Sequence, residues 1–155
     1  MLMIPTHGML YLLRHGDAEP ASSGQDAARR LTPKGRRQAR AAGRALARLG
    51  AGIEACLTSP KARAAETARL ACESLGLEPE TAAELGGGAF DALSLAAGRG
   101  EVLLVGHEPD LSDELARLTG AHARMRKGGV VVLDGSTLVA LLRPRDLAAI
   151  AGGGN

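Results

Sequence analysis

Residues 9–16 read Met-Leu-Tyr-Leu-Leu-Arg-His-Gly, an apolar run that ends abruptly at Arg14, His15 and Gly16. A short continuous apolar run, here Met9 to Leu13, is typical of a parallel strand buried on both faces. In an open α/β sheet, ligands bind in the crevice beyond the carboxyl ends of the strands. The stretch therefore predicts an α/β protein whose functional site begins at Arg14 and His15.

The rest of the chain alternates short apolar runs with longer stretches of helical periodicity, which supports the α/β class. We expect a loop at 17–31, strands at 55–58, 81–85 and 101–105, a hairpin of strands 129–133 and 137–142, and helices at 33–49, 60–75, 91–97 and 111–119. Thr32, Ser59 and Asp110 are the predicted helix caps. No repeat or linker is present, so we predict one domain over residues 9–150 with flexible tails at 1–8 and 151–155.

Length and composition fit one folded domain with an aliphatic core. The chain has 155 residues and no Trp, and Tyr11 and Phe90 are its only aromatic residues. Proteins that bind single-stranded nucleic acid rely on aromatic stacking, so this composition argues against such a partner. Of the 19 basic residues 16 are Arg, a side chain suited to phosphate, although a genome rich in G and C would produce the same bias.

The cysteines and the N-terminal residues predict a reduced, cytoplasmic protein. Cys56 and Cys72 are the only cysteines, and their spacing forms neither a zinc pair nor a disulfide framework. The first nine residues lack a basic region and contain Pro5 and His7, which makes a poor signal peptide. No apolar run approaches the roughly 18 residues that span a bilayer. We therefore expect no membrane association.

Basic and imidazole side chains follow three of the predicted strands. Arg14 and His15 follow the first, Arg63 lies in the first turn of the helix after the second, and His107 follows the strand at 101–105. Because the carboxyl ends of parallel strands meet at one edge of a sheet, we expect these four side chains to converge. Lys34 and Lys127 could add positive potential near the mouth of this site.

The chemistry that fits this set is phosphoryl transfer to an imidazole. Two guanidinium groups and a second, protonated imidazole can surround the phosphoryl oxygens, and such positioning is most of what the transfer needs. A positive charge about 5 Å from His15 would disfavour its protonation by about 3 kcal/mol. We therefore expect His15 to be neutral and nucleophilic at pH 7. Gly16 lets the backbone approach the ligand.

No metal or cofactor is required by this chemistry. His107 and Glu108 could suggest metal ligation. The two-metal phosphoesterases, however, need several further Asp, Asn and His ligands at strand ends, and the sequence does not supply them. We therefore predict a reaction that is independent of metal ions.

Four segments resemble, in the same order, the motifs of the histidine phosphatase superfamily, the phosphoglycerate-mutase-like group. They are Leu-Leu-Arg-His-Gly-Asp-Ala-Glu-Pro at 12–20, Leu-Thr-Pro-Lys-Gly at 31–35, Ser-Pro-Lys-Ala-Arg-Ala-Ala-Glu-Thr-Ala at 59–68 and Val-Leu-Leu-Val-Gly-His at 102–107. Lys127-Gly128-Gly129 is similar to the small SixA-type branch of phosphohistidine phosphatases. The resemblance covers about residues 10–142 and implies a single three-layer αβα domain with a mostly parallel central sheet.

The resemblance also implies roles for the four converging residues. His15 would be the phosphorylated nucleophile, Arg14 and Arg63 would clamp the phosphate, and His107 would contact the phosphoryl oxygens. Larger relatives use a carboxylate to protonate the leaving oxygen. Glu84 is a candidate for such a proton donor, although the residues around it match the family pattern poorly, and Asp17 and Glu19 are the other candidates. The small branch is expected to work without a strong acid, because imidazole leaves phosphorus more readily than an alkoxide.

Several substrates remain open at this point. Only residues 86–100 separate the third strand from the fourth, which leaves little chain for a lid and favours a phosphorylated protein of the histidine-containing phosphotransfer type. The alternatives are a broad phosphomonoesterase for small phosphate esters or polyphosphate-like substrates, and a non-catalytic phosphate-binding module. We expect a monomer without nucleic-acid or membrane partners.

Overall fold

Six strands form one central sheet in the computed structural model, which describes residues 8–21 and 24–152. The strands are β1 (Met9–Arg14), β2 (Ile53–Thr58), β3 (Glu80–Thr81), β4 (Glu101–Gly106), β5 (Val130–Asp134) and β6 (Thr137–Leu142), and their spatial order is β3-β2-β4-β1-β5-β6. β1 to β4 are mutually parallel, whereas β5 and β6 form an antiparallel hairpin against β1. This is the mostly parallel sheet that the sequence predicts.

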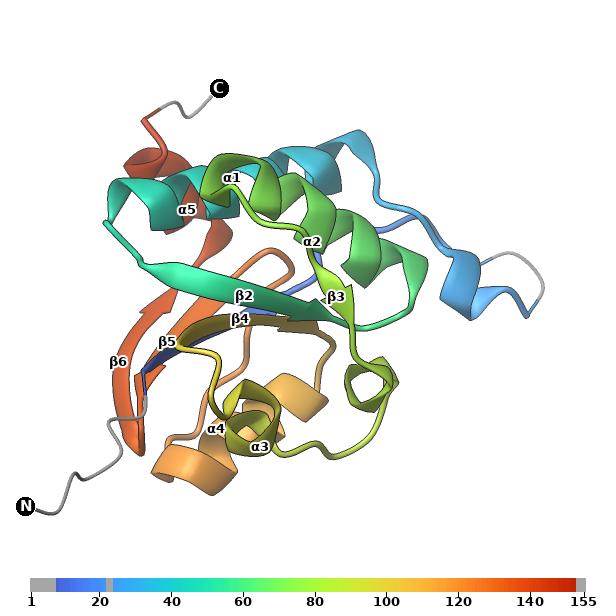
Figure 1. Ribbon diagram of the computed structural model, residues 1–155. Coiled ribbons are helices and arrows are strands. Elements are labelled where there is room, and N and C mark those ends of the chain that lie inside the picture. Colours follow the sequence, from blue (N-terminus) through green and yellow to red (C-terminus); the bar gives the residue numbers. More distant parts are fainter. Residues whose placement is uncertain (1–7, 22–23, 153–155) are drawn as a thin grey trace, which may run out of the picture.

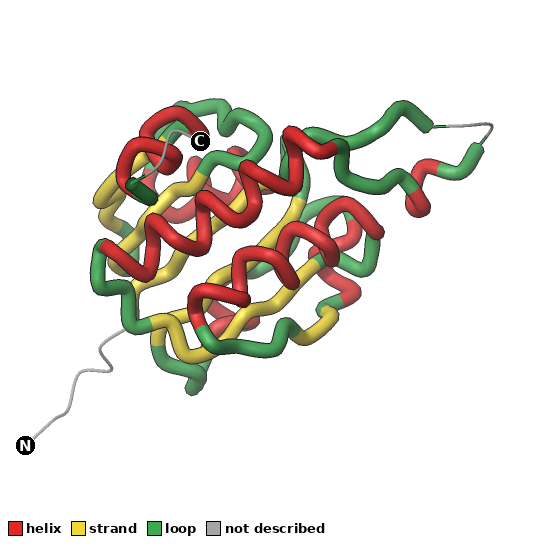
Figure 2. Tube along the Cα trace, turned by 90° about the horizontal axis from the view of Figure 1, so that it is seen from above, coloured by secondary structure: helices red, strands yellow, loops and turns green. Residues whose placement is uncertain are grey.

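Helices cover both faces of this sheet and make the expected three-layer αβα domain (Figure 1). One face carries α1 (Pro33–Arg48), α2 (Ala62–Leu75) and α5 (Pro144–Ile150), and the other carries α3 (Ala92–Ala96) and α4 (Asp110–Thr119). Short 3₁₀ turns lie at η1 (Asp26–Ala28) and η2 (Ala83–Gly86). α1 and α2 run side by side (Figure 2), where a Cβ on Gly43 would lie 2.2 Å from the Ala71 carbonyl oxygen. Glycine at this crossing allows the close approach.

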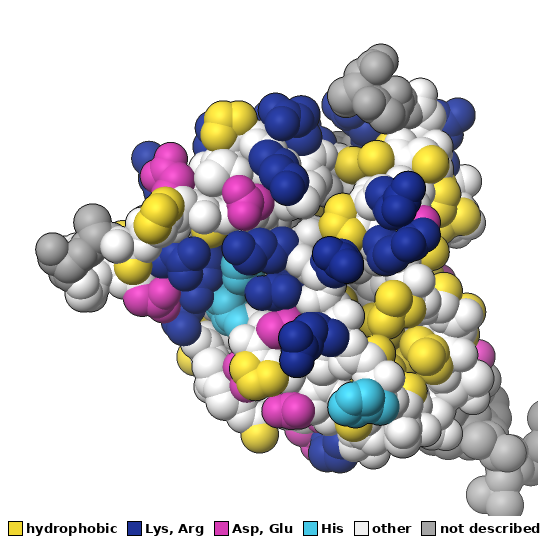
Figure 3. All heavy atoms as spheres, turned by 180° about the vertical axis from the view of Figure 1, so that it is seen from behind, with side chains coloured by type: hydrophobic (Ala, Val, Ile, Leu, Met, Phe, Trp, Pro, Cys, Tyr) yellow, Lys and Arg dark blue, Asp and Glu magenta, His cyan; other side chains and the backbone are white. Residues whose placement is uncertain are grey.

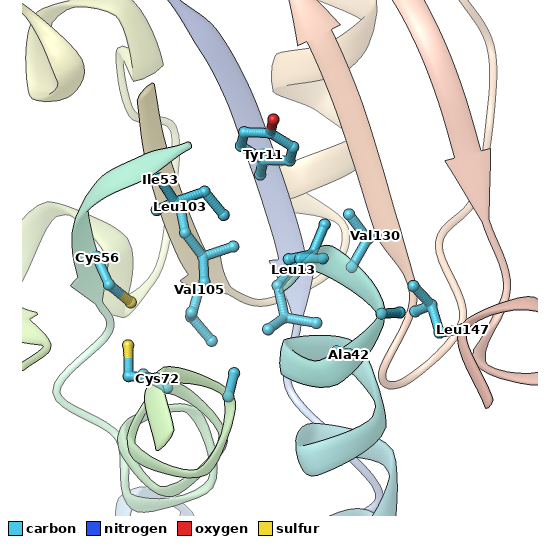
Figure 4. Close-up of a cluster of buried hydrophobic side chains, with 14 of the residues drawn as sticks. Tyr11, Leu13, Ala42, Ile53, Cys56, Cys72, Leu103, Val105, Val130 and Leu147 are labelled. Atoms are coloured by element: carbon cyan, nitrogen blue, oxygen red, sulfur yellow. The ribbon is translucent and has the colours of Figure 1, made fainter. Parts of the chain in front are cut away.

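The hydrophobic core has one cluster on each face of the sheet, built mainly from Leu, Val and Ala. On the α1–α2 face, Leu13, Leu103 and Val105 of β1 and β4 point toward the helices (Figure 4). Cys56 and Cys72 belong to the same cluster as buried free thiols whose sulfur atoms face each other. Their hydrogen bond and burial raise the pKa of Cys56. These cysteines therefore pack as small apolar residues.

Several local predictions of helix starts and strand ends are wrong, and each has a local reason. Thr32 caps α1 as expected, its hydroxyl oxygen accepting from the Gly35 N–H at 3.0 Å. Ser59, however, lies before the cap of α2, which is Lys61. Its hydroxyl instead accepts from the Lys61 N–H at 3.1 Å. Asp110 is the first residue of α4 rather than its cap, which is Pro109.

The strand predicted at 81–85 is also wrong, because β3 contains only two residues and the chain then turns into η2. Helix α5 is missing from the sequence prediction. It begins at Pro144 and buries only Leu147, so its apolar periodicity is too short to stand out. Ala151 and Gly152, predicted to begin a flexible tail, form the C-terminal turn of α5, and Arg48 donates to the Ala151 carbonyl at 3.1 Å.

The predicted tails otherwise lie mostly outside the described residues, which exclude 1–7 and 153–155. In the described part of the chain, every helix is too short or too polar to cross a membrane.

Candidate active site

The register of β1 and β4 brings the two histidines together. Arg14 pairs with Gly106 across these parallel strands, and the His15 N–H donates to the Gly106 carbonyl at 3.1 Å. His15 and His107, each the first residue beyond its strand, have ring centroids 5.2 Å apart. Both are buried. The sequence expectation that these side chains share one edge of the sheet agrees with this geometry.

Two glycines hold the loop after β1 against the start of α1. A Cβ on Gly16 would lie 2.5 Å from the Gly35 carbonyl oxygen, and a Cβ on Gly35 would lie 2.0 Å from the Asp17 carbonyl oxygen. Both distances are far below contact between real atoms. The Gly16 N–H is also fixed by the Thr67 hydroxyl of α2 at 3.0 Å. The segments around residues 16 and 35 therefore pack backbone against backbone and fix the direction of His15.

One hydrogen bond decides the tautomer of His15. Its Nδ1 lies 2.7 Å from the Gly16 carbonyl oxygen, which can only accept, so Nδ1 carries the proton. In the neutral ring the lone pair is then on Nε2. Burial, followed by the positive charges of Arg63, Arg14 and Lys127, lowers the pKa of His15 to about 4, against the opposing effect of the bond to Gly16. His15 is therefore neutral at pH 7 with Nε2 as its basic nitrogen.

His107 departs from the sequence expectation in its charge. Its Nε2 lies 2.8 Å from the Ser59 hydroxyl oxygen, at the neighbouring end of β2. Burial, then His15, Arg63 and Lys61, lower the pKa of His107 to about 3. The protonated second imidazole is thus not the form that the surrounding protein groups favour. Asp26 opposes this shift, and a further negative charge beside the ring, such as that of a phosphoryl group, would raise the pKa of His107 again.

Arg14 and Arg63 approach the histidines from β1 and α2. Arg14 donates from Nη1 to the Met125 carbonyl at 2.8 Å, and Arg63 donates from Nη1 to the Asp26 carbonyl at 3.0 Å. In residues 8–21 and 24–152, the buried side-chain nitrogen and oxygen atoms that lack a hydrogen-bond partner are Arg14 Nε, Arg63 Nε and His107 Nδ1. Buried polar atoms are rarely left without a partner unless a site uses them. All three belong to this cluster, which is the composition expected of an oxyanion site.

Asp26 of η1 is a site residue that the sequence reasoning missed. Its carboxylate lies 3.4 Å from Arg63 Nη2 and 3.6 Å from Lys61 Nζ. Arg63 is the main cause of the lowered pKa of Asp26. The residue lies in a polar segment predicted only as a loop, and no spacing or neighbour in the sequence marks it. Its contact with Arg63 arises because η1 packs against α2.

The three candidate proton donors lie in different surroundings. Asp17 accepts from the Thr32 hydroxyl at 2.8 Å and pairs with Lys127 at 3.5 Å, and the first of these contacts is the main cause of its lowered pKa. A carboxylate that is held ionised is a poor acid. Glu84 in η2 and Glu19 in the loop after β1 are exposed. None of the hydrogen bonds formed by these three described residues reaches His15 or His107.

The Glu108 carboxylate accepts hydrogen bonds from two backbone N–H groups and so has a structural role. One of its carboxylate oxygens accepts from the Ser112 N–H at 2.8 Å, and the other accepts from the Met125 N–H at 3.1 Å. It thus joins the start of α4 to the loop that receives Arg14. Within the described residues, no group of three or more His, Cys, Asp and Glu side chains is arranged to hold a metal ion.

The protonation of the two buried histidines leads to a first prediction. In the folded protein, both rings should stay neutral as the pH falls through 6.5 and should take up protons only near pH 4 and below. In the unfolded chain they should titrate near 6.5. Only the unfolded chain binds these protons between pH 6.5 and 4. The free energy of unfolding should therefore fall as the pH is lowered through that window. NMR titration of the imidazole carbons, with a urea-unfolded control, measures the titration midpoints in the folded and unfolded states. A folded-state midpoint near 6.5 for His15 contradicts the prediction.

Fold and site together describe an α/β protein of the phosphoryl-transfer type, and comparison with known proteins gives its family. The chain belongs to the histidine phosphatase superfamily, branch 1, whose model matches residues 10–94. The family resemblance found in the sequence is thereby confirmed, and the family consists of phosphatases and phosphotransferases. An uncharacterized protein of Picosynechococcus sp. is 36% identical over 137 residues, which cover 80% of this chain and 83% of that protein.

Solved structures agree with this assignment. SixA from Agrobacterium tumefaciens, a phosphohistidine phosphatase candidate, has a TM-score of 0.76 at 26% identity, covering 91% of this chain and 99% of that one. The protein histidine phosphatase SixA in complex with tungstate has a TM-score of 0.76 at 26% identity, with coverages of 90% and 99%. The α-ribazole phosphatase from Shigella flexneri, with a TM-score of 0.68, 21% identity and coverages of 88% and 96%, shares the fold.

Proposed function

We propose that this protein is a phosphohistidine phosphatase that removes phosphoryl groups from protein histidines through a covalent intermediate on His15. Arg14, Arg63 and His107 are proposed to bind the phosphoryl oxygens, with Gly16 giving the backbone access to the ligand. The observation that carries the proposal is the set of three buried, unpartnered nitrogens on Arg14, Arg63 and His107, beside a neutral imidazole. Two of these nitrogens are cationic, and an oxyanion supplies the acceptors that they lack.

The geometry supports a two-step reaction. In the first step the lone pair of His15 Nε2 attacks phosphorus, a P–N bond to His15 forms, and the P–N bond to the substrate imidazole breaks. The bond electrons stay on the substrate nitrogen, which takes a proton from solvent. In the second step water attacks phosphorus, the bond to His15 breaks, and phosphate leaves while the ring regains its lone pair. The bond from Nδ1 to the Gly16 carbonyl keeps Nε2 directed at phosphorus throughout.

The absence of a well-placed acid favours phosphohistidine over an alkyl ester as the substrate. Asp17 is held ionised, and Glu84 and Glu19 are exposed. An imidazole leaving group needs less protonation than an alkoxide. The site therefore lacks the proton donor that hydrolysis of an alkyl ester would need most. The likeness to SixA structures at 26% identity supports the same substrate class. We further propose that the reaction needs no metal and that the protein acts as a cytoplasmic monomer.

A small phosphate ester is the second candidate substrate. It is favoured by the short connection between β3 and β4, which leaves little chain for a lid, because an open site also admits small esters. The two candidates predict opposite preferences on simple compounds.

Rates on free phosphohistidine and on an aryl phosphate, measured in excess chelator, test the proposal. We expect a higher kcat/KM for phosphohistidine and no effect of the chelator. A marked preference for the aryl ester would overturn the phosphohistidine assignment and support the ester. Loss of activity in chelator, restored by a divalent metal, would overturn the metal-free mechanism.

A further inference from the structure

A large basic groove opens beside the proposed phosphoryl site. It has a volume of about 920 Å³ and is lined by seven cationic side chains and one carboxylate, that of Asp17. The cationic residues are Arg14, Lys34, Arg124, Arg126, Lys127, Arg143 and Arg145. They come from the end of β1, the start of α1, the loop before β5 and the start of α5. Figure 3 shows Lys and Arg side chains gathered around and beyond a pair of histidines on this face.

Positive charge in this groove is concentrated and largely unpaired. The whole chain has a formal net charge of only +2. Lys127 pairs with Asp17, and Arg143 pairs with Asp146. Four other cationic side chains of the groove are exposed, and they form no ion pair and donate no side-chain hydrogen bond to any described residue. They are Lys34, Arg124, Arg126 and Arg145. Like charges held together without counter-charges repel one another, so an anion from outside would be favoured here.

The groove is continuous with the catalytic cluster through Arg14. This residue lines the groove, while its Nε is one of the unpartnered nitrogens of the phosphoryl site. Lys127, which also lines the groove, is close enough to lower the pKa of His15. A ligand whose phosphoryl group lies at His15 would therefore extend its remaining atoms past Lys127 toward Arg124 and Arg145. Any anionic group on that part of the ligand would meet unpaired cations.

An exposed apolar strip beside the groove indicates the kind of ligand. Leu138, Val139 and Leu141 of the edge strand β6 are exposed, which is unusual for such side chains on a small protein. Leu141 also lines a shallow hollow of about 130 Å³ together with Arg124 and Arg126. Inorganic polyphosphate has no apolar part to use this strip. A nucleic acid would need aromatic platforms, but Tyr11 and Phe90 are both buried.

We infer that the basic groove binds an acidic protein segment, with apolar side chains among its Asp and Glu residues, that flanks the phosphohistidine of the substrate protein. This inference rests on the proposed function, since it names the partner of the same site. Charged contacts at the rim of an interface act mainly on association rate and selectivity. The groove would thus select among phosphorylated proteins, whereas the four residues at the strand ends would treat all phosphohistidines alike.

Binding of two synthetic peptides tests the inference without relying on hydrolysis. Both carry a phosphonate-triazole analogue of phosphohistidine and a fluorophore; one has Asp and Glu flanks and the other has Asn and Gln flanks. By fluorescence anisotropy at low salt, we expect the acidic peptide to bind at least about tenfold more tightly, and most of this preference to disappear at high ionic strength. Equal affinities would overturn the inference.

Matched charge variants locate the effect on the protein. The triple variant R124Q/R126Q/R145Q should lose about tenfold or more in affinity for the acidic peptide and little for the neutral one. The control triple R37Q/R44Q/R69Q removes the same charge from exposed positions on α1 and α2 and should change either affinity less than about twofold. Equal losses in both triples would mean that only net charge matters and would overturn the groove assignment.

Two further outcomes separate the possible errors. Tripolyphosphate could bind the wild-type protein as tightly as the acidic peptide does and lose as much affinity in the groove triple. That result would make the groove a site for small anions and would overturn the inference of a protein partner. Retained turnover of an aryl phosphate by the groove triple shows that its fold and catalytic cluster are intact. If the acidic peptide binds selectively but free phosphohistidine is not hydrolysed, the groove assignment stands and the proposed function fails.

Discussion

Replacing His15 with Ala is expected to lower the turnover of phosphohistidine by at least about 10⁴-fold, the scale of loss seen when an enzyme loses its nucleophile. The Nε2 lone pair of His15 forms the covalent bond to phosphorus in the proposed mechanism, and the ring is neutral because burial and three neighbouring cations lower its pKa. In the proposed mechanism His107 binds phosphoryl oxygens instead, with its Nε2 2.8 Å from the Ser59 hydroxyl and its Nδ1 without a partner among the described residues. The remaining cluster would still bind phosphate but would offer no group to receive it.

Labelling with a radioactive phosphodonor, followed by an alkaline quench, checks this prediction directly. Phosphohistidine survives base, so the wild-type protein should retain label and His15→Ala should retain none. His122→Ala, which removes an exposed histidine away from the cluster, is the control and should label normally. His15→Asn, with an amide near the position of Nδ1, tests whether the loss reflects folding. Label that persists in both His15 variants would remove His15 from its proposed role.

The site could be anticipated from the sequence because parallel strands align their ends. The apolar runs of β1 and β4 are recognisable, and each is followed at once by a histidine. Once the strands pair in parallel, Arg14 is opposite Gly106 and the two rings must be neighbours. No other knowledge of the tertiary structure is needed. The same holds for Arg63, which follows β2, the neighbour of β4 in the sheet.

Features that depend on tertiary contacts were not predictable in this way. Asp26 reaches Arg63 because η1 packs against α2, and no periodicity in the sequence predicts such a contact. Ser59 is a residue type that often caps helices, but its hydroxyl lies against His107 instead. The charge of His107 depends on burial and on the sum of its neighbours, which local sequence does not give. The basic groove combines four segments distant in sequence, so Lys34 and Lys127 alone gave no sign of its extent.

Arg63→Lys should have the next largest effect, a loss of about 10² to 10³ in kcat/KM, which is the range for removal of one preorganised oxyanion donor. Lysine keeps the positive charge but not the planar fork. Arg63 uses Nη1 and Nη2 on Asp26, while its buried Nε has no partner and is free for a phosphoryl oxygen. A single ammonium group cannot satisfy Asp26 and the phosphoryl group with the same geometry.

Comparison with three other variants shows whether the loss comes from the guanidinium itself. Arg69→Lys, an exposed position on the same helix, should leave kcat/KM unchanged. Asp26→Asn should change it less than about fivefold, because an ion pair to a half-exposed carboxylate contributes little. Arg63→Ala removes the largest charge contribution that lowers the pKa of His15, so the NMR midpoint of His15 should rise toward 6.5 in this variant. Wild-type kcat/KM in Arg63→Lys would mean that charge alone is sufficient there, and the phosphoryl clamp would then depend on Arg14 and His107.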